Sequence, residues 1–185
     1  MGSHFVEVSP KSMGLIVQLN HGSMSCENPI PCHSKMLVLH TNGIHDVAIR
    51  YCGCSRTIPY HIQLLRRRLY PASQVNVKTC ATFELLDLLH KLSLTTKAAT
   101  YNLYRALEKL TNNTSIGVPK NRCRTFRHML LQWRHLKLLK WAGHAHDPSG
   151  VAETQPGALA VPCPSCPHRG INIPADLDDI PLEFQ

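Results

Sequence analysis

Long apolar runs, a secretion signal and internal repeats are all missing from this chain of 185 residues. No stretch approaches the roughly 20 apolar residues that span a bilayer, and the opening MGSHFVEVSPKSMGLIVQLN lacks a charged segment followed by a clean apolar one. We therefore expect a soluble, intracellular protein with no membrane partner. A hydrophobic content of 43% and a charged content of 17% exclude wholesale disorder and predict a folded domain.

Acidic residues are scarce as well. The chain has 12 Asp and Glu against 20 Lys and Arg, and residues 114–146 include seven Lys and Arg but no Asp or Glu. A local field this positive favours a polyanionic partner.

Strand patterns come first along the chain, and helical patterns follow. β-rich segments at 36–40 and 45–52 flank Asn42-Gly43, a pair that favours a tight hairpin turn. Apolar spacing then predicts helices, with Thr79 as an N-cap and Gly143 as the end of the last helix. The predicted helices cover residues 61–69, 79–92, 95–110 and 121–142, and a short strand is expected at 158–161.

The predicted fold class is therefore α+β, with an insert of three to four helices after a small hairpin element, to which the cysteine pairs described next add a bound zinc ion and a knuckle. Residues 1–20 are expected to form a loose arm, and residues 175–185 an acidic linker. The single domain between them covers 21–174, with the helical insert at about 61–143.

Two close cysteine pairs predict the metal site. Without a secretion signal, the eight cysteines are better interpreted as metal ligands or buried thiols than as disulfides. In CGC, an extended backbone points Cys52 and Cys54 the same way, and in CPSC, Cys163 and Cys166 have the spacing of a zinc knuckle. Four thiolates would close a tetrahedral structural site with no position left for a reactive water. A redox pair at CPSC, or two pairs without metal, are the alternatives.

A second zinc ion is the alternative use of the remaining ligands. Cys80 and Cys123 lie in predicted helices and are expected to be buried apolar thiols. The second site would draw on Cys26, His45, His21 and His146, although these histidines also suit ordinary loop or hairpin positions. We thus expect one zinc ion, or two.

The helix predicted at 121–142 carries a basic stripe beside an apolar one. It can therefore pack on a core while presenting cations to phosphates, although ordinary solvated charges would look the same in sequence. The nucleic-acid-binding candidates are Lys120, Arg124, Arg127 and Arg134, extended by Arg66, Arg67 and Arg68.

Several spaced motifs together resemble a known family. They are HTNGIHDVAIRYCGC, QLLRRRLYPAS, KTCATFELLDLLHKL, ATYNLYRALEKLTNNT, WRHLKLLKWAGHAHDPSGV and CPSCPHRGINIP. This combination, from about residue 21 to 174, resembles the CxC-type cysteine cluster N-terminal to the catalytic domain of fungal KDZ transposases. The resemblance places the family's predicted zinc-chelating positions at Cys52, Cys54, Cys163 and Cys166, with Cys26, His45 and His146 on recurring positions. The family usually has an aromatic residue where Leu69 precedes YPA here, a small departure.

The resemblance implies a nuclear, zinc-binding module that binds or positions DNA during transposition and has no activity of its own. The transposase catalytic domain is expected to be missing from this chain, and no small-molecule substrate is expected. Protein partners would be that catalytic domain or other subunits. The first alternative is a zinc-held protein-interaction module for oligomerisation or recruitment of a host factor. An independent thiol or zinc enzyme is the weakest alternative, because it needs an open metal position or a reactive thiol.

Overall fold

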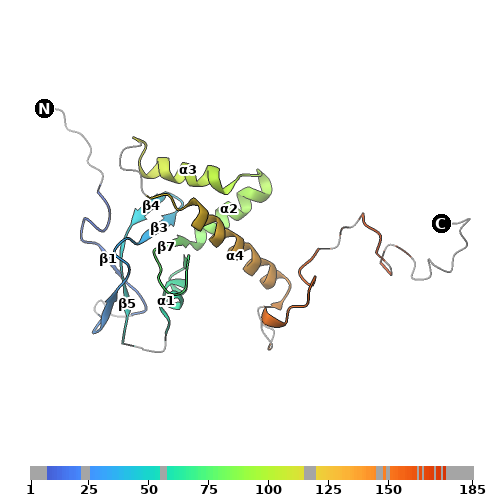
Figure 1. Ribbon diagram of the computed structural model, residues 1–185, viewed down its shortest axis with the longest axis horizontal. Coiled ribbons are helices and arrows are strands. Elements are labelled where there is room, and N and C mark those ends of the chain that lie inside the picture. Colours follow the sequence, from blue (N-terminus) through green and yellow to red (C-terminus); the bar gives the residue numbers. More distant parts are fainter. Residues whose placement is uncertain are drawn as a thin grey trace, which may run out of the picture. The chain divides into compact units, whose positions relative to one another are not determined.

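The computed structural model describes residues 8–21, 26–54, 58–114, 120–144, 148, 151–161, 163, 165–168, 170–171 and 173. These residues fall into two compact units, Met1–Leu136 and Lys137–Gln185. The described residues contain two small sheets and four α-helices, which confirms the predicted α+β class (Figure 1).

The first sheet has the strand order β1-β5-β2. Its central strand β5 (Ala48–Cys52) pairs in parallel with β1 (Ile16–Gln18) and antiparallel with β2 (Pro29–Pro31). β1 lies within the segment predicted to be a loose arm, and residue Leu19 directly after it is fully buried. The end of that segment is thus ordered by pairing with a distant strand, a contact that local periodicity does not reveal.

The second sheet has the order β4-β3-β7-β6 and contains the predicted hairpin. β3 (Leu37–His40) and β4 (Gly43–Asp46) are antiparallel, with His40 opposite Gly43. The turn is therefore Thr41-Asn42, one residue earlier than predicted, because Gly43 is already part of the strand. Gly43 packs closely against Thr111. β7 (Thr79–Thr82) and β6 (Leu69–Pro71) complete the sheet.

The predicted second strand of the hairpin, residues 45–52, is two strands. β4 ends at Asp46 and β5 begins at Ala48, in the other sheet. Its two parts are therefore split between sheets, and Cys52 ends a strand of the first sheet rather than of the hairpin.

Four helices form near the predicted positions: α1 (Tyr60–Arg66), α2 (Phe83–Thr95), α3 (Thr100–Thr111) and α4 (Cys123–Trp141). The predicted start of α2 at Thr79 is wrong, because residues 79–82 pair with β3 and β6 instead. Thr82 is the N-cap, and its side chain accepts a hydrogen bond from the Leu85 amide. Gly143 follows α4 at φ +84°, the left-handed conformation expected of a helix-ending glycine.

Two apolar cores hold the first unit together. The larger one joins the second sheet to α2, α3 and α4 through residues such as Leu39, Leu86, Tyr104 and Phe126. The smaller one includes Leu19, Ile49, Tyr51 and Leu64, and packs α1 against the first sheet. The smaller core therefore holds β5 and the residue that follows β1 in place.

The second unit is described by itself. It contains the end of α4, the short 3-10 helix η2 (Val151–Glu153) and a series of turns. The strand predicted at 158–161 is not formed: residues 156–159 are turns. The acidic linker predicted at 175–185 lies outside the described residues, and within those that are described no helix is both long and apolar enough to cross a membrane.

Candidate metal centre

Three strands of the first sheet bring potential metal ligands to one end of it. β1 runs parallel to β5, so His21 after β1 and Cys54 after β5 lie at the same end. β2 runs antiparallel to β5, so Cys26, which precedes β2, lies there too. Cys52 is the last residue of β5 itself. The sheet topology therefore gathers ligands that are spread over a long stretch of sequence.

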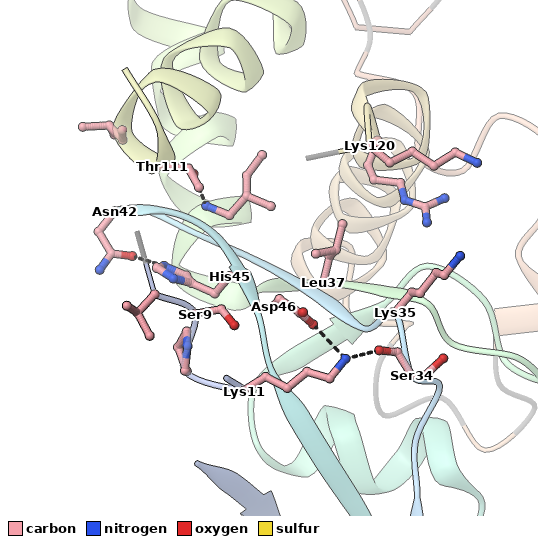
Figure 2. A pocket seen from close by; sticks show the side chains of 15 residues that line it. Ser9, Lys11, Ser34, Lys35, Leu37, Asn42, His45, Asp46, Thr111 and Lys120 are labelled. Carbon is pink, nitrogen blue, oxygen red and sulfur yellow. Dashed lines mark hydrogen bonds and ion pairs between the residues drawn. The ribbon is translucent and has the colours of Figure 1, made fainter. Parts of the chain in front are cut away.

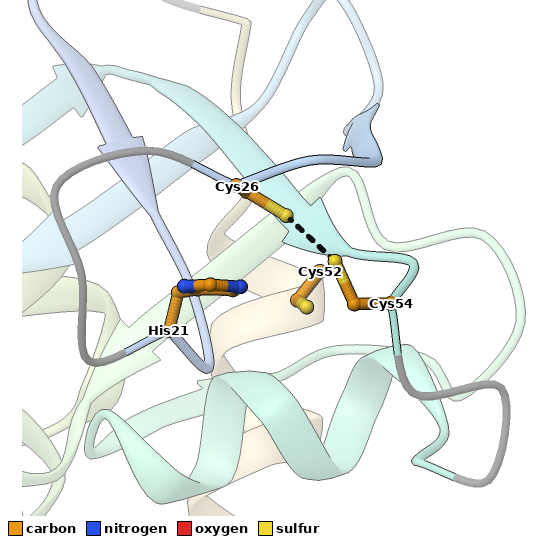
Figure 3. Close-up of side chains that lie close together, drawn as sticks. All are labelled: His21, Cys26, Cys52 and Cys54. Carbon is orange, nitrogen blue, oxygen red and sulfur yellow. Dashed lines mark hydrogen bonds between the residues drawn. The ribbon is translucent and has the colours of Figure 1, made fainter.

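The donor atoms of these four residues form a tight group. One ligand atom each from His21, Cys26, Cys52 and Cys54 lies within 4.8 Å of the others (Figure 3). The Cys26 and Cys54 sulfurs are 3.6 Å apart, too far for a disulfide of about 2.05 Å. Two thiolates at about 2.3 Å from a tetrahedral zinc ion would be about 3.8 Å apart. The geometry therefore fits a shared tetrahedral ion.

The chemistry of the donor set points the same way. Three thiols and one imidazole are soft to borderline ligands, which zinc favours over oxygen-preferring ions such as magnesium or calcium. Cys52 is buried, Cys54 is exposed, and His21 and Cys26 are half-buried, so the cluster is anchored on the core side and accessible on the other. Desolvation, and next the contact with Cys54, raise the pKa of the Cys26 thiol. A cation would have to displace that proton, so metal binding would release protons.

Gly53 lets β2 approach the CGC turn closely. Its amide donates to the Asn28 carbonyl at 2.9 Å. A Cβ atom at this position would lie 2.9 Å from that carbonyl oxygen and 2.8 Å from the Ile30 side chain. The glycine between the two cysteines is therefore required by the close packing between the strands.

A buried glutamine on α1 holds the end of β5. The Gln63 side chain is fully buried, and its oxygen accepts from the Cys52 amide at 2.9 Å. Its nitrogen donates to the carbonyls of Cys52 at 3.0 Å and Ile58 at 3.2 Å. This clamp was not predicted, and the only sequence signal for it is a polar residue inside the apolar run of α1, IQLL.

The structure combines residues that the sequence had assigned to two sites. Cys52 and Cys54 lie together with His21 and Cys26, which the sequence placed in a second site. His45 lies elsewhere: its Nε2 and the Asn42 side-chain oxygen are 2.8 Å apart, and burial, then the His40 charge, lower its pKa. His146 is outside the described residues.

The second cysteine pair lies in the second unit. The Cys166 amide donates to the Cys163 carbonyl at 3.1 Å, which closes a tight turn, and His168 Nε2 donates to the same carbonyl at 3.0 Å. The thiol of Cys166 lowers the pKa of Cys163 by hydrogen bonding. The pairing of Cys163 and Cys166 with Cys52 and Cys54 stays a prediction.

The other cysteines have ordinary packing environments. Cys80 is fully buried, and burial raises the pKa of its thiol strongly. Desolvation also raises the pKa values of Cys123 and Cys32, both partly buried. Cys80 thus fits the predicted buried thiol, whereas Cys123 only borders the larger core.

The predicted basic residues separate into three places. Arg124, Arg127 and Arg134 line one groove between the start of α3 and α4, with a volume of about 660 Å³. Lys120 lines a different pocket, described below. The remaining three extend from α1: the Arg66 guanidinium donates to Asn20 at 2.9 Å, and Arg67 and Arg68 line a hollow that also contains Glu84 and Asp87.

One comparison with known proteins identifies a family. The family model described as a CxC2-like cysteine cluster associated with KDZ transposases matches residues 11–115. The match covers more than half of the chain and includes all four residues of the metal cluster, whereas Cys163 and Cys166 lie outside it. No curated protein and no solved structure was found to match the chain.

Proposed function

Because the chain belongs to the CxC2-like cysteine clusters associated with KDZ transposases, we propose that it is a zinc-stabilised accessory module that binds or positions DNA. The matched family is the cysteine cluster, not the catalytic domain. Four protein ligands would occupy all four coordination positions of a tetrahedral zinc ion. Such a site suits a structural role, because no position is left for a substrate.

The observation that carries the DNA proposal is the shared groove of Arg124, Arg127 and Arg134. Guanidinium groups bind phosphate oxygens in a bidentate manner, and no Asp or Glu is among the described residues that line this groove. Tyr101 lines the same groove and is 59% exposed, so it offers a ring on which an unpaired base can stack. We therefore assign the nucleic-acid contact to this groove, and we propose a nuclear location to go with it.

Replacement of the three groove arginines by Gln tests the DNA proposal. We expect the affinity for DNA to fall at least tenfold at moderate salt, and the slope of log affinity against log salt to decrease, because phosphate contacts release counterions. The matched control replaces Lys78, Lys91 and Lys109, three exposed lysines outside the groove, by Gln. Equal losses in both triple variants, or no change of affinity with salt in the native protein, would contradict the groove.

The ligand set of the zinc ion is tested by metal analysis of two single variants. With His21, Cys26, Cys52 and Cys54 as the ligands, Cys54→Ser loses the zinc while Cys163→Ser keeps it. Equal loss from both variants would instead support the predicted site that joins Cys52 and Cys54 to Cys163 and Cys166. A loss of one of two ions from each variant would indicate two separate sites.

A protein-interaction module is the second candidate, and exposed apolar side chains favour it. Tyr101, Leu131 and Leu110 are each at least half exposed, and the first two line the groove that contains the arginines. Such a surface would bind another subunit or the transposase catalytic domain. A mass that rises with protein concentration, without any DNA shift, would support this candidate over the first.

A further inference from the structure

A pocket of about 540 Å³ lies beside the β3–β4 hairpin, and none of the four residues of the metal cluster lines it. Its walls come from residues 8–11, the hairpin, the end of α3 and the segment before α4 (Figure 2). The volume is within the range of about 300 to 1,000 Å³ that is typical of small-ligand sites. The metal cluster and the arginine groove do not explain this pocket.

Cations dominate the charged groups of the pocket. Lys11, Lys35, Lys120 and Arg122 line it, and Asp46 is its one carboxylate. Asp46 is already paired with Lys11 at 3.5 Å, and the Lys11 ammonium also donates to the Ser34 carbonyl. In the described part of the chain, no carboxylate lies within ion-pair distance of Lys35, Lys120 or Arg122. The pocket therefore has an uncompensated positive charge.

The side chain of Arg122 is a second, independent indication that the pocket binds an anionic ligand. Its Nε is buried and has no hydrogen-bond partner among the described residues. The backbone amide of Arg122 donates to the Tyr104 hydroxyl at 2.7 Å, which fixes the main chain here. A buried donor without an acceptor is unfavourable, and an anionic oxygen in the pocket would satisfy it. Figure 2 shows Lys35 and Lys120 on the same side of the pocket.

The rest of the lining is partly apolar. Leu37, Ile44 and Leu110 contribute to the walls, so a ligand with an apolar or aromatic body next to its anionic group would fit. We propose that this pocket binds a nucleoside monophosphate, either as a free nucleotide or as the 5′-phosphorylated end of a DNA strand. Lys35, Lys120 and Arg122 bind the phosphate, and the leucine and isoleucine side chains contact the base or sugar. The proposal does not depend on the arginine groove.

Titration calorimetry of the full chain tests the site with dAMP, dTMP, thymidine, inorganic phosphate and a short single strand with or without a 5′-phosphate. The phosphorylated probes are dAMP, dTMP and the strand with a 5′-phosphate. We expect these probes to bind better than thymidine, inorganic phosphate or the unphosphorylated strand. Binding of the mononucleotides alone identifies a free nucleotide, and preference only for the phosphorylated strand identifies a strand end. No preference for any phosphorylated probe, or inorganic phosphate binding as tightly as dTMP, would overturn the site.

Variants then locate the binding. Lys35→Gln with Lys120→Gln should weaken the phosphorylated probes about tenfold or more, because both charge-assisted contacts are lost. The control pair Lys78→Gln with Lys91→Gln removes the same charge elsewhere and should leave affinity unchanged. The triple variant of the arginine groove should also keep mononucleotide binding, so failure of the pocket and failure of the groove are told apart. An equal loss in the control pair would overturn the assignment.

Discussion

Two buried cysteines of this chain differ in what surrounds their sulfur atoms. Cys52 is 4% exposed, and its sulfur lies in a group with two other thiols and an imidazole. Cys80 is 0% exposed, and it packs in the smaller apolar core. Burial alone therefore does not separate a ligand from a packing thiol, whereas the neighbouring donor atoms do.

The same substitution at these two positions should give different results. Cys52→Ala removes a ligand, so we expect the loss of bound zinc. Cys80→Ala removes only a sulfur atom from a packed core, so we expect full zinc content and a decrease of about 1 to 2 kcal/mol in the free energy of unfolding. Metal analysis and urea denaturation of both variants check this, and zinc retained by Cys52→Ala would contradict the cluster.

Gly53→Ala tests the close approach at the CGC turn. The added methyl group would meet the Asn28 carbonyl at 2.9 Å and the Ile30 side chain at 2.8 Å, so β2 or the turn must shift. We expect a destabilisation of about 1 to 3 kcal/mol and weaker zinc binding, although no ligand is removed. Competition with a chromogenic chelator measures the affinity, and an unchanged value would show that the turn does not position the thiols.

At the level of elements, α1 matters to the metal cluster through one side chain. Gln63→Leu places an apolar side chain of similar size at this buried position of α1. The backbone amide and carbonyl of Cys52 then lose the hydrogen bonds that they make with the Gln63 side chain. We expect a loss of about 1 to 3 kcal/mol in stability and weaker zinc binding. Gln74→Leu is the matched control, because Gln74 is exposed. The clamp is unnecessary for the site if the two variants bind zinc equally well.

Elements with strong local signals could be predicted, and those that depend on distant pairing could not. The hairpin and the helices follow from turn residues and apolar spacing. β1 does not, because it becomes a strand only by pairing with residues more than 30 positions away, and β7 does not, because it lies between β6 and the distant strand β3. The same limit applies to the site: Cys52 and Cys54 were predicted as ligands, but their proximity to His21 and Cys26 follows from the order β1-β5-β2.

For the whole chain, a zinc ion at this cluster would act as a cross-link between three strands. The sulfurs of Cys26 and Cys54 are separated by 28 positions in sequence, and closing such a loop restricts the unfolded chain. By analogy with a disulfide, the stabilisation is about 3 to 4 kcal/mol. The strands it joins are short, with three residues in β1 and three in β2, so the first sheet depends on such support more than the helices do.

Removal of the metal should therefore lower the thermal stability of the whole protein. With excess chelator we expect the unfolding midpoint to fall by roughly 5 to 15 °C, because the apo form loses the binding free energy that favours the folded state. Differential scanning calorimetry measures the shift, and zinc added back should reverse it. Cys52→Ala, which already lacks the ion, should show no further shift with chelator. A native protein whose midpoint is the same with and without chelator would contradict a structural role for the metal.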